Sequence, residues 1–188
     1  MKIIGVSGTN GSGKDTVGQM LAERHNYLFV SMTDMLRDEA KKRGQPIERE
    51  ALRTISAEWR RESGLGVLID KSVDFFDAQN NKYDGLVVAS LRNPGEVDRV
   101  HELGGQVVWV DAAPKVRYDR IFSRQRTEED NKTFDQFLAE EQAEMSHSGD
   151  EATLNMSGVK ERADIFIENN GSDIDAFKSD IEKTLGLT

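Results

Sequence analysis

The sequence contains no cysteine, only three histidines and no long apolar run. Without cysteine, the chain can form neither disulfides nor thiolate metal sites, and the scattered histidines show no metal-ligand spacing. No stretch approaches the roughly 18 apolar residues that a membrane helix needs. The amino-terminal segment also lacks the apolar core and small-residue cleavage site of a signal peptide. We therefore expect a cytoplasmic protein without a membrane partner.

Acidic residues outnumber basic residues by 34 to 25, which gives a formal net charge of −9. An acidic chain repels the phosphates of nucleic acids and anionic membranes, so we expect no nucleic-acid polymer as a partner. A local basic pocket is compatible with this total, and the positions of the arginines therefore matter more than the sum. The 188 residues suit one domain, residues 1–188, acting as a monomer or homodimer.

Five short apolar runs are rich in valine, isoleucine and phenylalanine, and are nearly continuous rather than alternating. This pattern is typical of strands buried on both faces of a parallel sheet. Helical segments separate the runs, and the alternation predicts a three-layer α/β domain with a five-stranded parallel sheet and helices on both faces. The predicted strands are 2–7, 27–31, 85–90, 106–111 and 163–169, and the predicted helices are 14–25, 33–43, 47–62, 67–79, 96–103, 115–124, 134–145 and 174–185.

The stretch "GTNGSGKD" lies between a predicted strand and a predicted helix, and it fits G-x-x-x-x-G-K through Gly8, Gly13 and Lys14. Small residues let backbone N–H groups surround a phosphate, and the helix amino terminus adds partial positive charge. The alternative is an ordinary glycine-rich turn, but the position of Lys14 favours a nucleotide-binding loop. The residues expected to bind the nucleotide here are Gly8, Asn10, Gly11, Ser12, Gly13, Lys14, Asp15 and Thr16.

Asp15 departs from the usual loop, which has Ser or Thr directly after the lysine. Its carboxylate could hold Mg²⁺ directly or through water, or it could simply be a favourable negative charge in the first turn of a helix. The Thr16 hydroxyl comes one position late and could still reach a phosphate. We take Asp15, Thr16 and, further along the chain, Asp34 as the candidate metal ligands.

A lysine followed by a residue without a hydroxyl and then by threonine is similar to the loop of nucleoside monophosphate kinases such as adenylate kinase. "GKDT" in particular resembles the phage-type deoxynucleoside monophosphate kinases. The resemblance implies a P-loop NTPase fold, with ATP and Mg²⁺ as cofactors and a small phosphate acceptor. It also implies that residues 33–81 form a helical acceptor-binding insert and that residues 124–162 contain a short lid.

The segment "VSMTDMLRDEAKKRG" resembles the part of adenylate kinase that leads to Leu-Arg. The resemblance implies that Arg37 holds the phosphate of the acceptor and that Asp34 lies near the reacting groups. Arg92 follows the third predicted strand, where open α/β sheets place ligands, and is similar to an acceptor-binding arginine of the same family. The alternative for Arg37 is a solvated charge on a helix surface.

One departure concerns the acid that ends the third strand in dephospho-coenzyme A kinases and many related kinases. Ser90 or Leu91 occupies that position here. The acidic partner of Mg²⁺ would then be Asp15 or Asp34, with Asp111 as a weaker candidate, and the sequence does not distinguish among them.

Arg120 and Arg124 lie four residues apart on one predicted helix face, and two cations there repel unless an anion lies between them. They resemble the arginine pair at the base of the lid in nucleoside monophosphate kinases, which implies a role on the transferred phosphoryl group. The alternative is a charged helix face with Asp119 and Glu128 as partners. Two further arginines that could share the role are Arg117 and Arg126.

The final strand and its "NNGS" turn are similar to the last segment of dephospho-coenzyme A kinases, which implies that Asn170 and Gly171 border the adenine. The alternative is a plain turn before the last helix. We therefore expect an ATP-dependent phosphotransferase acting on a nucleoside or deoxynucleoside monophosphate. The alternatives are a dephospho-coenzyme A kinase, a nucleotide-binding switch or ATPase without a small acceptor, and a non-catalytic module. The expected catalytic residues are Lys14, Asp34, Arg92, Arg120 and Arg124.

Overall fold

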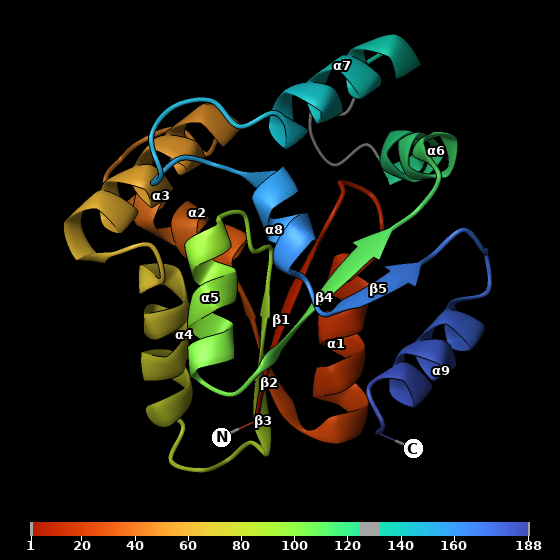
Figure 1. The fold of residues 1–188 in the computed structure, drawn as a ribbon, viewed down its shortest axis with the longest axis horizontal. Helices are drawn as coiled ribbons and strands as arrows, with labels where there is room; N and C mark the ends of the chain where they lie inside the picture. The colour runs from red at the N-terminus through yellow and green to blue at the C-terminus, as the bar shows by residue number, and fades with distance from the viewer. Residues whose placement is uncertain (1, 125–131, 188) are drawn as a thin grey trace.

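The computed structural model describes residues 2–124 and 132–187, with the backbone alone at Arg124. In these ranges the chain forms a parallel five-stranded sheet in the order β2-β3-β1-β4-β5 with helices on both faces (Figure 1). This arrangement confirms the three-layer α/β fold predicted from the alternating pattern. The strands are β1 (Lys2–Gly8), β2 (Tyr27–Ser31), β3 (Gly85–Ala89), β4 (Gln106–Asp111) and β5 (Ile165–Glu168).

The central strand β1 pairs with β3 on one side and β4 on the other, so that Val6 lies beside Ala89 and Val108. Val6 and Val108 are buried in the core on one face of the sheet, and Leu86 and Val107 are buried in the core on the other face. Burial on both faces explains why these strands have continuous apolar sequences rather than alternating ones. The carboxyl ends of β1, β2 and β3 consequently meet at one edge of the sheet.

Helices pack on the two faces of the sheet and form two separate hydrophobic cores. In Figure 1, α1 and α9 lie on one side of the sheet, and α4, α5 and α8 lie on the other. The helices are α1 (Lys14–His25), α2 (Met32–Lys42), α3 (Arg49–Ser63), α4 (Val67–Asp77), α5 (Pro94–Glu102), α6 (Pro114–Arg124), α7 (Phe134–Met145), α8 (Met156–Arg162) and α9 (Ile174–Thr184).

Each of the eight predicted helices is present, with boundaries that differ from the prediction by a few residues. Helix α8 was not predicted. Its Met156 and Val159 are buried in the core against α5, and Gly158 packs so closely that an added Cβ would lie 2.7 Å from Pro94. The last part of segment 124–162 therefore belongs to the packed scaffold.

Helices α2 and α3 connect β2 to the rest of the insert and lie near the carboxyl end of the sheet (Figure 1). Arg43, at the end of α2, donates hydrogen bonds to Glu39 at 2.8 Å and to Glu58 of α3 at 2.9 Å. These contacts join the two helices into one wall. Throughout the part of the chain that the structure describes, no helix combines the length and the apolar character needed to cross a membrane.

Candidate functional site

A cavity of about 770 Å³ opens at the carboxyl ends of β1, β2 and β3, within the size range of small-molecule sites. One wall comes from the glycine-rich loop and the start of α1, and the opposite wall comes from α2, α3 and the turn after β3. The predicted site residues that line this cavity are Asn10, Gly11, Gly13, Lys14, Asp15, Thr16, Asp34, Arg37 and Arg92. The fold thus brings the residues of the glycine-rich loop and those that follow β2 and β3 to the same cavity.

The loop between β1 and α1 has the backbone conformation that its glycines permit. Gly8 and Gly13 have φ values of 149° and 98°, and a Cβ at Gly8 would lie 2.0 Å from the carbonyl oxygen of Val110. Ser12 Oγ is fully buried and has no hydrogen-bond partner among the described residues. A buried hydroxyl without a partner is costly, and a bound phosphate oxygen would satisfy it, so the loop suits a nucleotide phosphate.

Two side chains from neighbouring strands hold the loop in place. Asn169, after β5, donates from Nδ2 to the carbonyl oxygen of Ser12 at 2.9 Å. Thr9 donates from Oγ1 to Asp111 Oδ1, at the end of β4, at 2.7 Å. Because each contact joins the loop to the rigid edge of the sheet, the cradle is formed without a ligand.

Asp111 binds protein groups on several sides rather than facing the cavity. Besides Thr9, its carboxylate accepts from the backbone N–H of Ala112 at 2.8 Å and lies 3.5 Å from Arg117 and 3.8 Å from Lys160. It is also absent from the cavity lining. We interpret Asp111 as a residue that positions the loop, so that of the three candidate acids only Asp15 and Asp34 line the cavity.

Asp15, Thr16 and Asp34 bring oxygen atoms to the same cavity as Lys14. The described residues contain no cluster of three or more metal-ligating side chains. Mg²⁺ does not need one, because it typically takes one or two protein oxygens together with phosphates and waters. The donor set therefore fits Mg²⁺ bound with a nucleotide.

On the wall opposite the glycine-rich loop, Asp34 and Arg37 pair with each other. Arg37 Nη1 donates to Asp34 Oδ1 at 2.8 Å, and both side chains are about half exposed to the cavity. Ser31 caps α2 by accepting from the backbone N–H of Asp34 at 3.3 Å. The pair is one turn of helix apart and can separate for a ligand at little cost, because exposed ion pairs contribute little.

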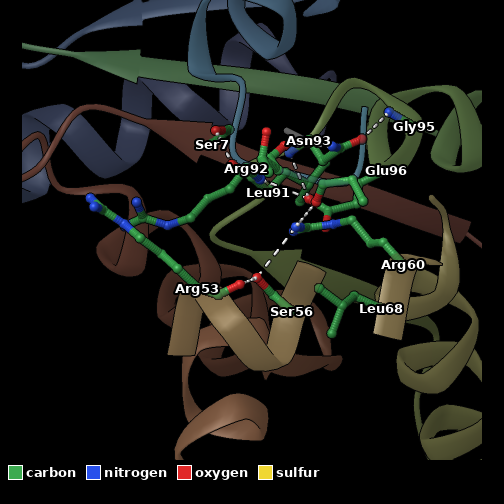
Figure 2. A network of polar contacts seen from close by, with 12 residues as sticks. Ser7, Arg53, Ser56, Arg60, Leu68, Leu91, Arg92, Asn93, Gly95 and Glu96 are labelled. Atoms are coloured by element: carbon green, nitrogen blue, oxygen red, sulfur yellow. Dashed lines mark hydrogen bonds and ion pairs between the residues drawn. The ribbon is translucent and has the colours of Figure 1, made fainter. Parts of the chain in front are cut away.

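Arg92 lies in a turn that Glu96 organises (Figure 2). Glu96 Oε2 accepts from the backbone N–H groups of Arg92 at 2.7 Å and Asn93 at 3.1 Å. Its other oxygen accepts from Arg60 Nη2 of α3 at 2.7 Å, and both members of this pair are buried. Ser90, just before the turn, has a φ of 74°, which is strained for a residue with a side chain. The backbone of Arg92 is therefore fixed from α3 and α5 together.

The side chain of Arg92 joins a cluster that the sequence did not predict. Its guanidinium lies 3.7 Å from Glu144 of α7, which also lies 3.5 Å from Arg49 and 2.8 Å from Arg53, both on α3. Burial alone would raise the pKa of Glu144, but the three arginines together hold it below its ordinary value. The pKa of Arg92 is below its ordinary value, chiefly because of burial. The neighbouring Arg49 and Arg53 lower this pKa further, and Glu144 raises it in part.

Of the predicted lid and adenine residues, Arg120, Asn170 and Gly171 lie outside the cavity lining. Arg120 donates from Nη2 to the carbonyl oxygen of Gly171 at 2.8 Å, and Asn170 Oδ1 accepts from the N–H of Ala113 at 2.6 Å. These bonds join α6 and the residue that precedes it to the turn after β5. Arg117 is buried and donates to Ala112 and to Glu141 of α7, so it holds structure together. The side chain of Arg124 and all of Arg126 lie outside the described residues.

Four site residues were missed at the sequence level: Arg49, Arg53, Glu144 and Asn169. Arg49 and Arg53 lie four apart on one helix, the same cue that drew attention to Arg120 and Arg124. That spacing could have identified the α3 pair. Nothing in the sequence linked the pair to Arg92 or Glu144, because those contacts are formed only by the fold.

Comparison with known proteins assigns the family. A model of the AAA domain family AAA_18 matches residues 4–146. A UPF0200 protein of Pyrococcus abyssi is 32% identical over 184 residues, covering 96% of this chain and 93% of the relative. Another, from Pyrobaculum aerophilum, is 31% identical and covers 98% and 97%. The chain therefore belongs to the AAA_18 domain family and to the UPF0200 family.

Solved structures with similar folds include two shikimate kinases. That of Bacteroides thetaiotaomicron has a TM-score of 0.62 at 13% identity and covers 98% of each chain. That of Acinetobacter baumannii, in complex with shikimate, has a TM-score of 0.51 at 17% identity and covers 100% of this chain and 94% of that chain. At this identity the likeness shows the fold alone, which is that of P-loop kinases.

Proposed function

We propose that this member of the UPF0200 family is an ATP-dependent phosphotransferase that moves the γ-phosphoryl group to a small phosphorylated acceptor. A nucleoside or deoxynucleoside monophosphate is the acceptor that its motifs favour. One observation carries the proposal: a single cavity has Lys14 and the phosphate loop on one wall and Arg37 and Arg92 on the opposite wall. A site with two anion-binding walls suits transfer between two phosphorylated molecules.

The loop N–H groups and the start of α1 would hold the nucleotide phosphates, and Lys14 would place its charge on the outer ones. Arg37 and Arg92 would hold the acceptor, since guanidinium groups bind phosphate oxygens in pairs. Asp15, Thr16 and Asp34 carry the oxygens that would hold Mg²⁺, which would supply positive charge to the phosphate oxygens when bound. Catalysis by these residues would come mainly from positioning and charge stabilisation.

Five further predicted residues complete the proposed roles. Arg120 and Arg124, at the end of α6, would stabilise charge on the transferring group, and Asp34 would lie near the reacting oxygen. Asn170 and Gly171, in the turn that meets α6, would border the adenine. Phosphoryl transfer requires little covalent chemistry from the protein, so these groups need only converge as the substrates bind.

The first test is ADP release from Mg-ATP with a panel of acceptors. The panel contains each ribo- and deoxynucleoside monophosphate, dephospho-coenzyme A, shikimate, and a well without acceptor. We expect one monophosphate to raise the rate far above the well without acceptor. Equal slow release in every well would contradict the proposal and favour a nucleotide-binding switch or ATPase without a small acceptor.

The variant Lys14→Ala tests whether the lysine of the loop is needed for acceptor-dependent ADP release. Removing one preorganised charge on a transferring phosphoryl group typically costs about 10²-fold or more in rate, so acceptor-dependent release should fall to the background. Lys2→Ala, at the exposed start of β1, is the control and should leave release unchanged. Full turnover in a folded Lys14→Ala protein would contradict the assignment of the loop.

A further inference from the structure

Three arginines converge on one carboxylate at the edge of the cavity. Arg53 Nη2 lies 2.8 Å from Glu144 Oε1, Arg49 Nη1 lies 3.5 Å from the same oxygen, and Arg92 Nη1 lies 3.7 Å from Oε2. Only 16% of the Glu144 side chain is exposed, whereas the arginines remain between 35% and 50% exposed. The carboxylate is thus enclosed, while the arginine side chains, which line the cavity, are partly exposed.

The charges in this cluster do not balance. The ion pairs of Arg53 and Arg92 both go to Glu144, so one carboxylate faces two guanidiniums. Arg49 contacts Glu144 as well and also has other partners, including Glu140 at 3.6 Å. Like charges held this close repel one another. The cluster therefore suits a ligand with more negative charge than a single carboxylate, and a phosphate dianion offers that charge with several acceptor oxygens.

The position of the cluster connects it to the proposed reaction. Arg49, Arg53, Arg92 and Glu144 all line the 770 Å³ cavity that contains Lys14. Three of them, Arg49, Arg92 and Glu144, also line an adjoining hollow of about 20 Å³ beside the phosphate loop. In Figure 2 the side chains of Arg53 and Arg92 extend from α3 and from the turn after β3 toward one place.

Apolar side chains lie beside these arginines. Ile47 and Leu52 line the same cavity, and Ile47 is 49% exposed. A ligand with an anionic end and an apolar or planar body would contact both the arginines and this wall.

We propose that Arg49, Arg53 and Arg92 form the subsite for a phosphate group of the acceptor, and that the carboxylate of Glu144 fills this subsite while the acceptor is absent. The identity of the ligand as acceptor rests on the proposed function; the subsite itself rests on the cluster. Because Glu144 is on α7, phosphate binding displaces it and releases a contact between α7 and α3. The protein's own carboxylate thus occupies the subsite, and an acceptor must compete with Glu144.

Calorimetric titration with inorganic phosphate at constant ionic strength and neutral pH tests the subsite without any nucleotide. All proteins carry Lys14→Ala, because the loop is itself a phosphate site. Loss of the competing carboxylate in Glu144→Gln should tighten phosphate binding by about tenfold, the value of one charge-assisted hydrogen bond. Adding Arg53→Met should abolish that gain.

Asp135→Asn is the matched control, since it removes the same charge from an exposed position in the first turn of α7. Equal gains in Asp135→Asn and Glu144→Gln would reduce the effect to net charge and overturn the proposal. An unchanged affinity in Glu144→Gln would overturn it as well. These results are independent of turnover, so a failed acceptor panel and a failed subsite are distinguishable.

Hydrogen exchange supplies a second measurement on the protein with its native Glu144. Saturating phosphate should speed amide exchange at the end of α7, because the contact of Glu144 with α3 is lost. Unchanged or slower exchange in α7 under saturating phosphate would contradict displacement. Glu144→Gln should show the faster exchange without phosphate.

Discussion

The two walls of the cavity are built in different ways. The wall proposed to bind the nucleotide, called the nucleotide wall, is a continuous stretch of chain, Gly8 to Thr16. Its supports are single hydrogen bonds with Asn169 and Asp111. The wall proposed to bind the acceptor, called the acceptor wall, is assembled from side chains of α2, α3, α7 and the turn after β3. It is held by charged contacts, including the buried pair of Arg60 and Glu96.

This difference determines which of the two walls can tolerate amino-acid substitutions. A backbone cradle depends on glycine geometry and tolerates little change, whereas a side-chain wall can be altered one residue at a time. Specificity for the acceptor is therefore expected to reside in α3 and its partners. One fold can then serve different ligands in different proteins.

The largest effect is expected from breaking the support of the acceptor wall. Arg60→Met leaves Glu96 buried without its cationic partner, and removing one member of a buried ion pair destabilises by about 3–5 kcal/mol. For a chain of this size, the melting temperature should fall by roughly 6–20 °C. Thermal unfolding measured by circular dichroism checks this.

The neighbouring Arg61→Met is the control for Arg60→Met. Arg61 bonds to the loop after α7, through Asp150 at 2.8 Å, but both side chains are half exposed. The melting temperature of Arg61→Met should therefore stay close to that of the unchanged protein.

Nucleotide affinity should be retained in Arg60→Met while acceptor binding weakens, because Glu96 positions Arg92. Equal losses on both sides would show that the two walls are not independent.

The sequence predicted the strand, glycine-rich loop and helix that contain Gly8 to Thr16, because the information for them is local. Gly8, Gly13 and Lys14 are a few residues apart, and their flanking strand and helix follow from short-range periodicity. The strands were predicted for the same reason. The cluster of Arg49, Arg53, Arg92 and Glu144 joins segments far apart in the sequence, and no periodicity encodes which of them meet.

Helix α8 was missed for a related reason. It has only seven residues and contains Gly158, which disfavours a helix by itself. The glycine is needed for close packing against Pro94, a contact that tertiary structure alone creates. Local propensity and the final fold therefore disagree at this point, and the fold prevails.

The second largest effect is expected from Gly8→Ala, on the nucleotide wall. In Gly8→Ala the new Cβ would meet the carbonyl oxygen of Val110 at 2.0 Å, so the loop or β4 must move. Such overpacking costs about 1–3 kcal/mol in addition to backbone strain. We expect nucleotide binding, measured by calorimetry, to be lost while phosphate binding at the α3 arginines persists.

Gly44→Ala is the control for Gly8→Ala, because Gly44 also has a positive φ, 65°, but no atom lies within 4 Å of its added Cβ. It should cost only the backbone strain, about 1–2 kcal/mol, and leave nucleotide binding intact. Normal nucleotide affinity in Gly8→Ala would mean that the cradle is not preorganised by its contact with β4.

The smallest effect is a pH dependence confined to the acceptor wall. The pKa of Glu144 lies below its ordinary value of 4.5 in the folded protein, so its ion pairs stabilise the fold above that pH and are lost as the pH falls through the lower folded pKa. The difference in unfolding free energy between the unchanged protein and Glu144→Gln should thus be largest near neutral pH and shrink in acid. Glu182, whose pKa is also lowered, titrates in both proteins and cancels. A difference that stays constant down to pH 3 would mean that Glu144 holds α7 by packing rather than by charge, and the contrast between the two walls would lose its electrostatic basis.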